Sequence, residues 1–259
     1  MDYLLFRLYG PMASWGEIAV GEIRHTANYP SKSAIIGLMA AALGVKRDET
    51  EKQLRMQESY AVAVEVYSPG TLLRDYHTAQ VPDSVGKFTY KTRRDELVHG
   101  KERLGTILSS REYRSDALSL VAIRALPGAP YNLRTIKDHL KKPRLHLYLG
   151  RKSCPLAAPM NPMISEKKKD FHEAFASYEH KAMLPIHADE KDCLSKRDIY
   201  WLGLTDERHY YWEGEASDFS DTLDLSKMQI RTRHDQPLSR KRWQFSSRQE
   251  HYFYFPGGE

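Results

Sequence analysis

A glycine followed by three hydrogen-bond donors and a cysteine is the part of this sequence most suggestive of chemistry. The stretch LYLGRKSCPLAAP contains Gly150, Arg151, Lys152, Ser153 and Cys154 between a short alternating apolar run and a proline. A glycine allows another group to approach the backbone closely. Arginine, lysine and serine can each donate hydrogen bonds to phosphate oxygens. The segment therefore predicts an anion-binding turn or an activated thiol, with a solvent-facing basic turn as the structural alternative.

Catalysis by Cys154 is the less favoured of these interpretations. Arg151 and Lys152 could lower the pKa of the thiol, but no signature of a cysteine enzyme surrounds it. The only other cysteine is Cys193 and no CxxC pair occurs, so a four-cysteine zinc site is excluded and a reducing cytoplasm is the simple location. We expect Cys154 to be a packed residue beneath a turn, and we expect no catalytic residue, metal ion or cofactor.

Other basic segments point to a phosphate backbone. Ser31, Lys32 and Ser33 begin an expected helix, where free N–H groups favour an anion, although ordinary capping is the alternative. Three clusters, FTYKTRR, SREYRS and SRKRWQF, mix cations with rings. Cations can hold phosphates while rings stack on unpaired bases. Each cluster alone could be an ordinary surface, but together they favour RNA binding.

The histidines give no metal-binding or catalytic pattern. The sequence has eleven histidines. It contains no HExxH, GxSxG, P-loop or paired-carboxylate motif. His25, His77 and His234 have basic or aromatic neighbours, and one of them could activate a 2′-hydroxyl in metal-free RNA cleavage. For each of them we favour a structural or binding role.

The elements that must position these residues alternate between strands and helices. Periodicity predicts strands over 3–10, 60–67, 71–77, 118–126 and 144–150, and helices over 31–44, 132–142 and 165–179. We expect the strand at 71–77 to pair with the preceding strand across the turn at 68–70, and the polar segment 75–111 to protrude as a hairpin or mobile loop. A basic-aromatic tail precedes a final strand. The first 150 residues thus read β-α-β-β-insert-β-α-β, which indicates an α+β fold with a ferredoxin-like or RRM-like sheet.

Composition limits the class of protein. The chain has 259 residues, of which 41% are hydrophobic, enough for a folded core. No apolar run approaches the roughly 20 residues of a membrane span, and the N-terminus reads as a strand and not as a signal peptide. A net charge of +5, from 39 basic and 34 acidic residues, leans modestly toward a polyanionic partner.

Several motifs resemble the CasD family, the Cas5 subunits of the type I-E CRISPR surveillance complex Cascade. They occur in the family order: LYGPMASWG, YPSKSAIIGLMAAALG, LRDYHT, LSSREYRSDA, KPRLHLYLGRKSCPLAAP and SRKRWQFSSRQEHYF. The resemblance covers most of residues 1–160 and the tail from about 231. Residues 161–230 match no pattern of the family, so their role stays open.

The resemblance implies a fold of the RAMP superfamily and a role in antiviral defence. It implies an RRM-like domain over 1–155 with a thumb hairpin inserted at about 75–111. A smaller β-rich C-terminal extension follows over 156–259, with a variable region at about 161–230. Such a subunit grips the 5′ handle of the CRISPR RNA, caps the filament of CasC backbone subunits, contacts the large subunit CasA, and meets target DNA only through the guide.

The resemblance also supplies an alternative function. In type I-E complexes a separate subunit, CasE, cuts the precursor RNA, whereas subtype I-C relatives of this chain cut it themselves. The alternative is therefore a metal-independent endoribonuclease with Tyr76, His25 or His77 as the base. A third possibility is a subunit whose basic surface mainly docks acidic faces of neighbouring proteins. The predicted RNA-binding residues are Ser31, Lys32, Ser33, Tyr76, His77, Arg111, Tyr113, Arg114, Gly150, Arg151, Lys152, Ser153, Arg240, Lys241, Arg242 and Trp243.

Overall fold

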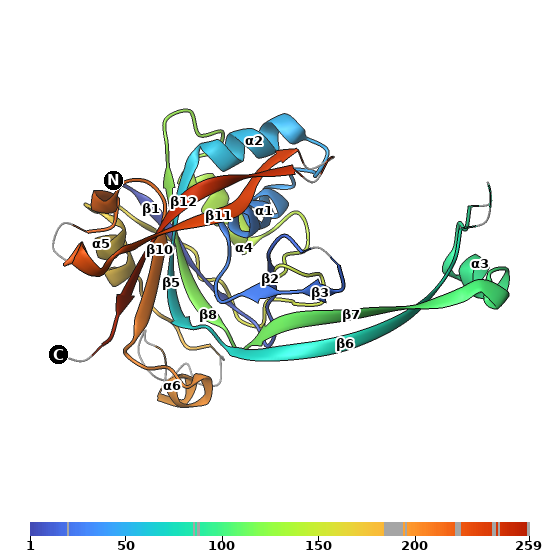
Figure 1. Ribbon diagram of the computed structural model, residues 1–259. Helices are drawn as coiled ribbons and strands as arrows, with labels where there is room; N and C mark the ends of the chain where they lie inside the picture. The colour runs from blue at the N-terminus through green and yellow to red at the C-terminus, as the bar shows by residue number, and fades with distance from the viewer. Residues whose placement is uncertain are drawn as a thin grey trace.

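An antiparallel sheet forms the body of the protein, and a long two-stranded ribbon projects from it (Figure 1). The computed structural model describes residues 1–19, 21–84, 86, 89–183, 194, 196–220, 224–239, 242 and 244–257. Within these residues the sheet has seven strands in the order β11-β12-β10-β5-β8-β1-β9. Their bounds are β1 (Tyr3–Tyr9), β5 (Tyr60–Ser68), β8 (Leu118–Ala125), β9 (Met163–Ser165), β10 (Arg208–Trp212), β11 (Gln229–Ser239) and β12 (Gln244–Phe255).

Four of these strands and two helices form the predicted β-α-β-β-α-β unit. Helix α1 (Lys32–Leu43) connects β1 to β5, and helix α4 (Leu133–Lys141) connects β8 to β9. Strand β8 lies between β1 and β5, and β1 lies between β8 and β9, which is the split arrangement of a ferredoxin-like fold. The predicted α+β class is confirmed.

The predicted strand at 144–150 is wrong. Leu147 and Leu149 are buried as expected, but the segment is an irregular loop with one isolated bridge, from Tyr148 to Pro155. The fourth strand of the unit is instead β9, which pairs with β1. The alternating apolar residues of this segment pack one side of an extended loop into the core, but the backbone does not pair with another strand.

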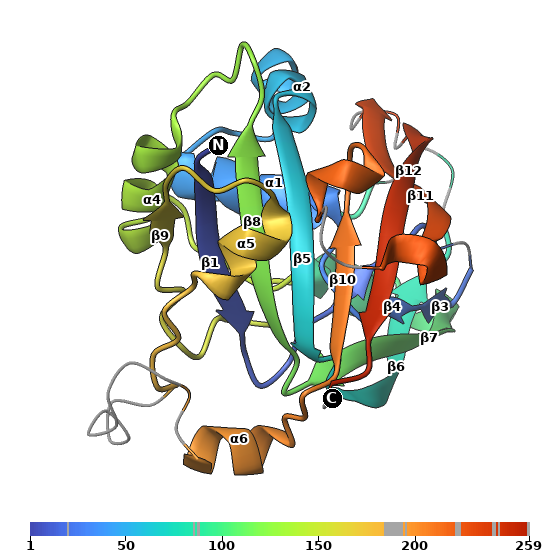
Figure 2. The ribbon, with the colours of Figure 1, turned by 90° about the vertical axis from the view of Figure 1, so that its left-hand side faces the viewer.

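Both faces of the sheet are covered, and the alternation along β1 explains how. Leu4, Phe6 and Leu8 face α1 and α4, whereas Tyr3 and Leu5 enter a second cluster with α5 (Phe171–Ala176). Figure 2 shows α5 across one face of the sheet, with α1 and α4 behind it. Because successive side chains of a strand point to opposite faces, a strand that is covered twice is expected to be apolar on both faces, as β1 is apart from the buried Arg7.

Helix α1 begins and ends as predicted. The Ser31 side chain accepts a hydrogen bond from the Ala34 backbone N–H, and Gly44 ends the helix with N–H bonds back to its last turn. The helix buries its apolar residues against the sheet and against α4. Helix α2 (Thr50–Glu58) follows and leads directly into β5.

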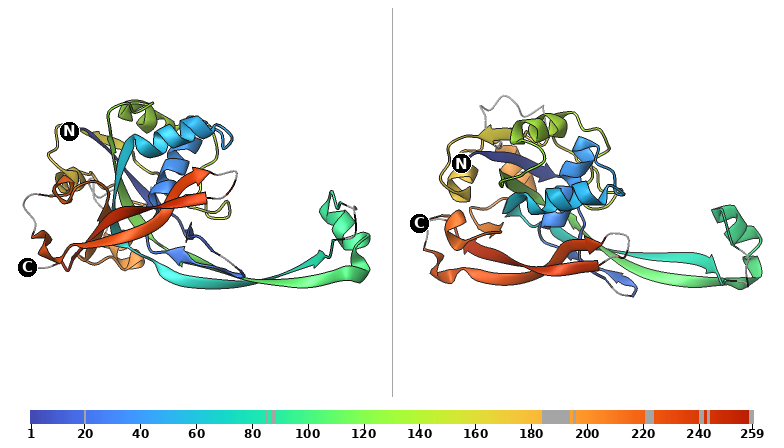
Figure 3. Two further views of the ribbon diagram at one scale, coloured as in Figure 1. Left: turned by 45° about the horizontal axis from the view of Figure 1, so that its top comes forward. Right: turned by 90° about the horizontal axis from the view of Figure 1, so that it is seen from above.

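The inserted hairpin is confirmed, with wider bounds than predicted. Strand β6 (Thr71–Pro82) pairs with β7 (Leu104–Ser115) over its whole length, and α3 (Arg93–Val98) and a 3₁₀ helix at Lys101–Arg103 lie at the far end. Figure 3 shows this ribbon, which we call the thumb, running away from the body in both views. None of the described helices is long and apolar enough to cross a membrane.

The expected pairing of residues 71–77 with β5 is therefore wrong. Strand β5 lies between β8 and β10, and the chain at Gly70 turns out of the sheet to begin the thumb. Gly70 has φ +68, and a Cβ there would lie 2.4 Å from the Ser115 backbone oxygen, so only glycine fits this crossing.

Short strands join the N-terminal loop to the thumb base. Strand β3 (Ile23–Arg24) pairs in parallel with β7, and β2 (Trp15–Gly16) pairs with β4 (Thr26–Ala27). An isolated bridge also links Ala13 to Arg114. The loop after β1 is thereby fastened to the root of the thumb.

The C-terminal part adds strands to the same sheet, although its division from the first part at residue 155 stays a prediction. The predicted helix at 165–179 is shortened to α5, with Phe171, Phe175 and Tyr178 buried as one stripe. The tail forms a hairpin of β11 and β12, where one final strand was expected. The remaining elements are α6 (Lys196–Leu202) and 3₁₀ helices at Ala216–Asp218 and Leu225–Lys227.

Candidate functional site

The turn at Gly150 is closed and held against the N-terminal loop. The Leu149 N–H donates to the Cys154 carbonyl at 2.7 Å, and the Cys154 N–H donates to the Arg151 carbonyl at 2.9 Å. The Ser14 N–H donates to the Leu149 carbonyl at 3.0 Å. Gly150 has φ +84, and a Cβ there would lie 1.8 Å from the Ser14 oxygen. The backbone of this turn therefore has one allowed position, which fixes the side chains it carries.

Cys154 is a packed residue, as predicted. Its side chain is fully buried in the main core cluster. Burial raises the pKa of the thiol, and the opposing effects of Ser153 and Arg151 are smaller. A buried neutral thiol is a poor nucleophile. This removes the activated thiol and leaves two interpretations of the turn, an anion-binding site and a solvent-facing basic turn.

Arg151 is the best-positioned cation of the turn. Its guanidinium lies over the Tyr113 ring, 4.8 Å from the ring centre, and its Nη2 is 3.5 Å from the Arg24 carbonyl oxygen. Its Nη1 has no hydrogen-bond partner within the described part of the chain. The ring holds the guanidinium in place, but the unpartnered Nη1 atom is itself buried and is not open to an incoming oxygen. Lys152 and Ser153 are exposed beside it.

The tyrosine beneath Arg151 differs from an exposed stacking ring. Tyr113 is only 7% exposed and one of its faces meets Arg151. Tyr76, by contrast, is 64% exposed on the stalk of the thumb. Tyr76 is therefore an accessible ring on the thumb, whereas Tyr113 supports a cation.

Strand register sorts the thumb-base residues onto two faces. Tyr76 lies opposite Ser110, and Arg74 lies opposite Glu112. Because directly opposed residues share a face and neighbours along a strand alternate, one face carries Arg74 and Tyr76. The other face carries His77, Arg111 and Tyr113, and Arg151 contacts this second face. Three predicted residues, Arg111, Tyr113 and Arg151, are thus brought together.

Glu112 binds three elements at the thumb base. Its carboxylate accepts hydrogen bonds from Arg74 Nη2 at 2.9 Å and from the Thr26 N–H at 3.3 Å. His25 Nδ1 lies 3.2 Å from the same carboxylate. Burial alone would raise the pKa of Glu112, but these hydrogen bonds outweigh it and the pKa is lowered. The Glu112 carboxylate therefore has to be charged to make all of these contacts with Arg74, Thr26 and His25.

The lowered pKa gives a prediction about stability. We expect Glu112→Gln to lower the free energy of unfolding at pH 7 by about 1–3 kcal/mol, because bonds to a charged acceptor are lost. A carboxyl whose folded pKa is depressed stabilises above its unfolded pKa and loses that contribution as pH falls through the folded pKa. The difference in free energy of unfolding between variant and wild type should therefore shrink below pH 4.5, the ordinary pKa of this group. Urea unfolding at pH 7 and pH 4 measures both differences, with the exposed Glu102→Gln as control. If the difference in free energy of unfolding were the same at pH 4 as at pH 7, the loss of stability would come from altered packing and not from the charge of Glu112.

Ser31, Lys32 and Ser33 have structural partners. Ser31 is the helix cap, and its hydroxyl lies 3.1 Å from that of Ser33. Lys32 Nζ is 2.7 Å from a carboxylate oxygen of Glu213, which follows β10, and both side chains are largely buried. This group therefore anchors α1 to the neighbouring strands, and its predicted phosphate contact has no additional support.

The tail residues are only partly described. Arg240, Lys241 and Trp243 lie outside the described residues. Arg242 is exposed at the end of the β11–β12 hairpin. Arg114 donates a hydrogen bond to Asn28, a residue of the N-terminal loop. Among the described residues no group of three or more His, Cys, Asp or Glu side chains could hold a metal ion.

Sequence reasoning missed Arg24 and Arg74 as parts of this region. Arg24 enters through β3, whose pairing with β7 cannot be read from a two-residue strand. Arg74 had a usable signal, since it stands two residues before Tyr76 on an expected strand and so shares its face. We call the surface formed by Arg24, Arg111, Arg151 and Lys152 the thumb-base surface; Arg74 and Tyr76 lie on the opposite face of the ribbon.

Comparisons with known proteins agree on one family. A family model described as CRISPR-associated protein (Cas_Cas5) matches residues 3–250. The CRISPR system Cascade subunit CasD of Escherichia coli (strain K12) is 35% identical over 167 residues, which span 61% of this chain and 69% of that protein.

Solved structures give the same result. A chain of a CRISPR RNA-guided surveillance complex superposes with a TM-score of 0.61 and 26% identity, over 97% of this chain and 89% of the other. A second structure, described as a Cas protein, has a TM-score of 0.56 and 24% identity over 98% and 95% of the two chains, and supports the fold alone.

Proposed function

Because the chain belongs to the Cas5 family of CRISPR-associated proteins, we propose that it is the RNA-binding subunit of a type I-E Cascade complex. In this proposal it grips the 5′ handle of the CRISPR RNA and caps one end of the CasC backbone filament. The observation that carries the proposal is the rigid basic turn at Gly150–Ser153, packed against the root of a projecting thumb. CasA is the proposed neighbour on the large-subunit side, and target DNA is met only through the guide.

The thumb-base surface fits a single-stranded phosphate backbone. Arg151, Lys152 and Ser153 offer donors from a turn whose backbone cannot shift, so little ordering is needed when RNA binds. Arg111 adds charge on the same side of the thumb base. Since phosphate contacts carry most of the affinity for single-stranded RNA, binding should be tight and sensitive to salt.

Tyr76 is an accessible ring on which an unpaired base could stack. Tyr76 stands exposed on the stalk, and Arg74 lies two residues before it on the same face. Base–aromatic stacking contributes about 1–3 kcal/mol per base. A handle nucleotide would meet this ring only after the RNA crosses from the face that Arg151 contacts to the opposite face of the ribbon.

One observation favours binding over cleavage. The proposed bases His25 and His77 lie on opposite faces of the ribbon, so they cannot form an acid–base pair around one phosphodiester. Each lies beside a carboxylate, with His25 Nδ1 3.2 Å from Glu112 and His77 Nε2 2.5 Å from Asp75. The endoribonuclease is kept as the second candidate because Tyr76 and His25 share a face.

The experiment that tests the proposal incubates the purified protein with its cognate repeat RNA and with a 5′-handle oligonucleotide, in the presence of a chelator. Filter retention and denaturing gels read binding and cleavage from the same samples. We expect retention without cleavage. Cleavage at the handle boundary that leaves a 2′,3′-cyclic phosphate, and that His25→Ala abolishes, would replace this proposal with the endoribonuclease. Retention of neither RNA, also in the co-expressed complex, would remove RNA binding from the function.

A further inference from the structure

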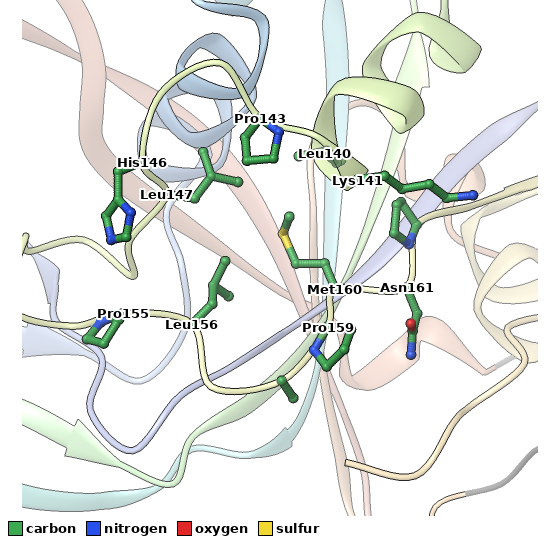
Figure 4. Close-up of a pocket in the computed structure, with 12 residues that line it drawn as sticks. Leu140, Lys141, Pro143, His146, Leu147, Pro155, Leu156, Pro159, Met160 and Asn161 are labelled. Carbon is green, nitrogen blue, oxygen red and sulfur yellow. The ribbon is translucent and has the colours of Figure 1, made fainter. Parts of the chain in front are cut away.

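A second surface, separate from the thumb base, contains a cavity of about 420 Å³. It lies between the end of α4, the loop at 143–147 and the segment at 155–162 (Figure 4). Its apolar side chains include Leu140, Leu147 and Met160, which are buried in the main core. The figure shows Leu156 and Met160 between the two loops. A cavity of this size holds one or two large apolar side chains of a partner.

The walls of the cavity are preformed. Four prolines line it, and proline fixes φ and lacks an N–H donor. The buried Arg7 holds the second wall, because its Nε donates to the Pro159 carbonyl at 2.9 Å and its backbone N–H donates to the Met160 carbonyl at 2.9 Å. The Ala157 N–H also donates to the Tyr9 carbonyl. A partner side chain would therefore enter a site that needs little reorganisation.

Basic residues lie at the α4 end of the cavity and in the loop that follows it. Lys141 and His146 line the cavity, and the exposed Lys142 and Arg144 stand next to them in the sequence. No acidic residue lines the cavity, and the nearest acidic residue along α4 is Asp138, one turn before Lys141. An apolar cavity with a cationic rim is complementary to an acidic segment that carries apolar side chains.

We propose that this cavity docks an acidic segment of a partner protein, with one apolar side chain inserted and its carboxylates on Lys141, Lys142 and Arg144. RNA fits less well because, among the described residues, no Phe, Tyr or Trp side chain lines the cavity for a base to stack on. The inference extends the proposed function and does not depend on it, since the thumb-base residues take no part in the cavity.

The test uses fluorescein-labelled peptides and fluorescence anisotropy with the full-length protein. The probe is the acidic peptide EDLEFLED, and the comparison peptides are EDSESSED and KKLKFLKK. We expect saturable binding of the first peptide and at least tenfold weaker binding of the other two. Lys141→Glu combined with Lys142→Glu should weaken binding of the acidic peptide at least tenfold. Lys227→Glu, a charge reversal at an exposed site on another element, should leave it unchanged.

A second variant separates the cavity from its charge. Leu156→Lys places a long side chain in the cavity and adds a positive charge to it. We expect this variant to lose binding of the acidic peptide. If the contact were purely electrostatic, the added positive charge would instead strengthen peptide binding. Binding that survives in Leu156→Lys, equal binding of the basic peptide, or no saturation by the acidic peptide would overturn the proposal.

The same variants distinguish this inference from the RNA-binding function. Competition of the acidic peptide by the 5′-handle RNA would show that the cavity is part of the RNA site and would also overturn the inference. If the proposed RNA-binding function is right, the Lys141→Glu, Lys142→Glu variant should retain the handle RNA at wild-type strength, whatever the peptides do.

Discussion

Gly150→Ala is expected to lower the free energy of unfolding by about 2–4 kcal/mol and to weaken binding of the handle RNA at least tenfold. A left-handed backbone costs a residue with a side chain about 1–2 kcal/mol. The new Cβ would also lie 1.8 Å from the Ser14 backbone oxygen, and backbone cannot rotate away as a side chain can. The turn must shift, and Arg151 and Lys152 shift with it. Urea unfolding measures the first effect, and filter retention at 0.15 M salt measures the second.

The control for this variant is Gly16→Ala. Gly16 lies two residues after Ser14, in the N-terminal segment that the Gly150 turn contacts, and a Cβ there would meet nothing within 4 Å. We expect its unfolding and RNA retention to differ little from wild type. Full-strength RNA binding by a folded Gly150→Ala protein would mean that the position of this turn does not matter for binding.

The double variant Arg151→Ala, Lys152→Ala is expected to weaken RNA binding about 30- to 100-fold at 0.15 M salt while leaving the fold intact. Both cations would be removed from the one turn that presents them together, and Lys152 is exposed. Two lost phosphate contacts on a single strand should also reduce the salt slope of log K by about 1.4. Retention measured from 0.05 to 0.5 M salt gives both quantities.

A matched pair of charges on another element provides the control. Lys52→Ala with Arg55→Ala removes the same charge from exposed positions of α2. We expect a small, uniform effect and an almost unchanged slope. If the two double variants behaved alike, the turn would contribute only to the general charge of the protein.

Elements whose signals are local could be predicted from the sequence. The first strand, the helix that Ser31 caps, and the helix that Asn132 caps all occur where periodicity and capping residues placed them. Pairings between distant segments could not. The turn at 68–70 favours a local hairpin, but β5 is apolar on both faces and needs apolar neighbours, which β8 supplies and the polar β6 does not.

The candidate site was predictable in its residue types and less so in its partners. The Gly150 turn and the thumb were expected from composition and spacing. The pairing of Lys32 with Glu213 was not, because the two residues are far apart in the sequence and meet only through the sheet. Tyr113 was expected as a ring for bases, and its support of Arg151 likewise requires the three-dimensional arrangement. Types of side chain are local information, whereas their availability depends on the fold.

The thumb also affects how the body folds. Strands β5 and β8 are neighbours at the centre of the sheet, with Ser68 opposite Leu118, yet the whole thumb separates them in the chain. If β5 and β8 paired first, the chain between them would have to close as one long loop. Pairing of β6 with β7 can instead begin at the tip of the thumb, where only the shorter segment from 83 to 103 has to close. Each further residue pair of β6 and β7 then forms without closing a new loop. When Thr71 pairs with Ser115, β5 and β8 lie next to each other. We therefore expect the ribbon to form before the two central strands pair, so that weakening its strand pairs would slow formation of the sheet.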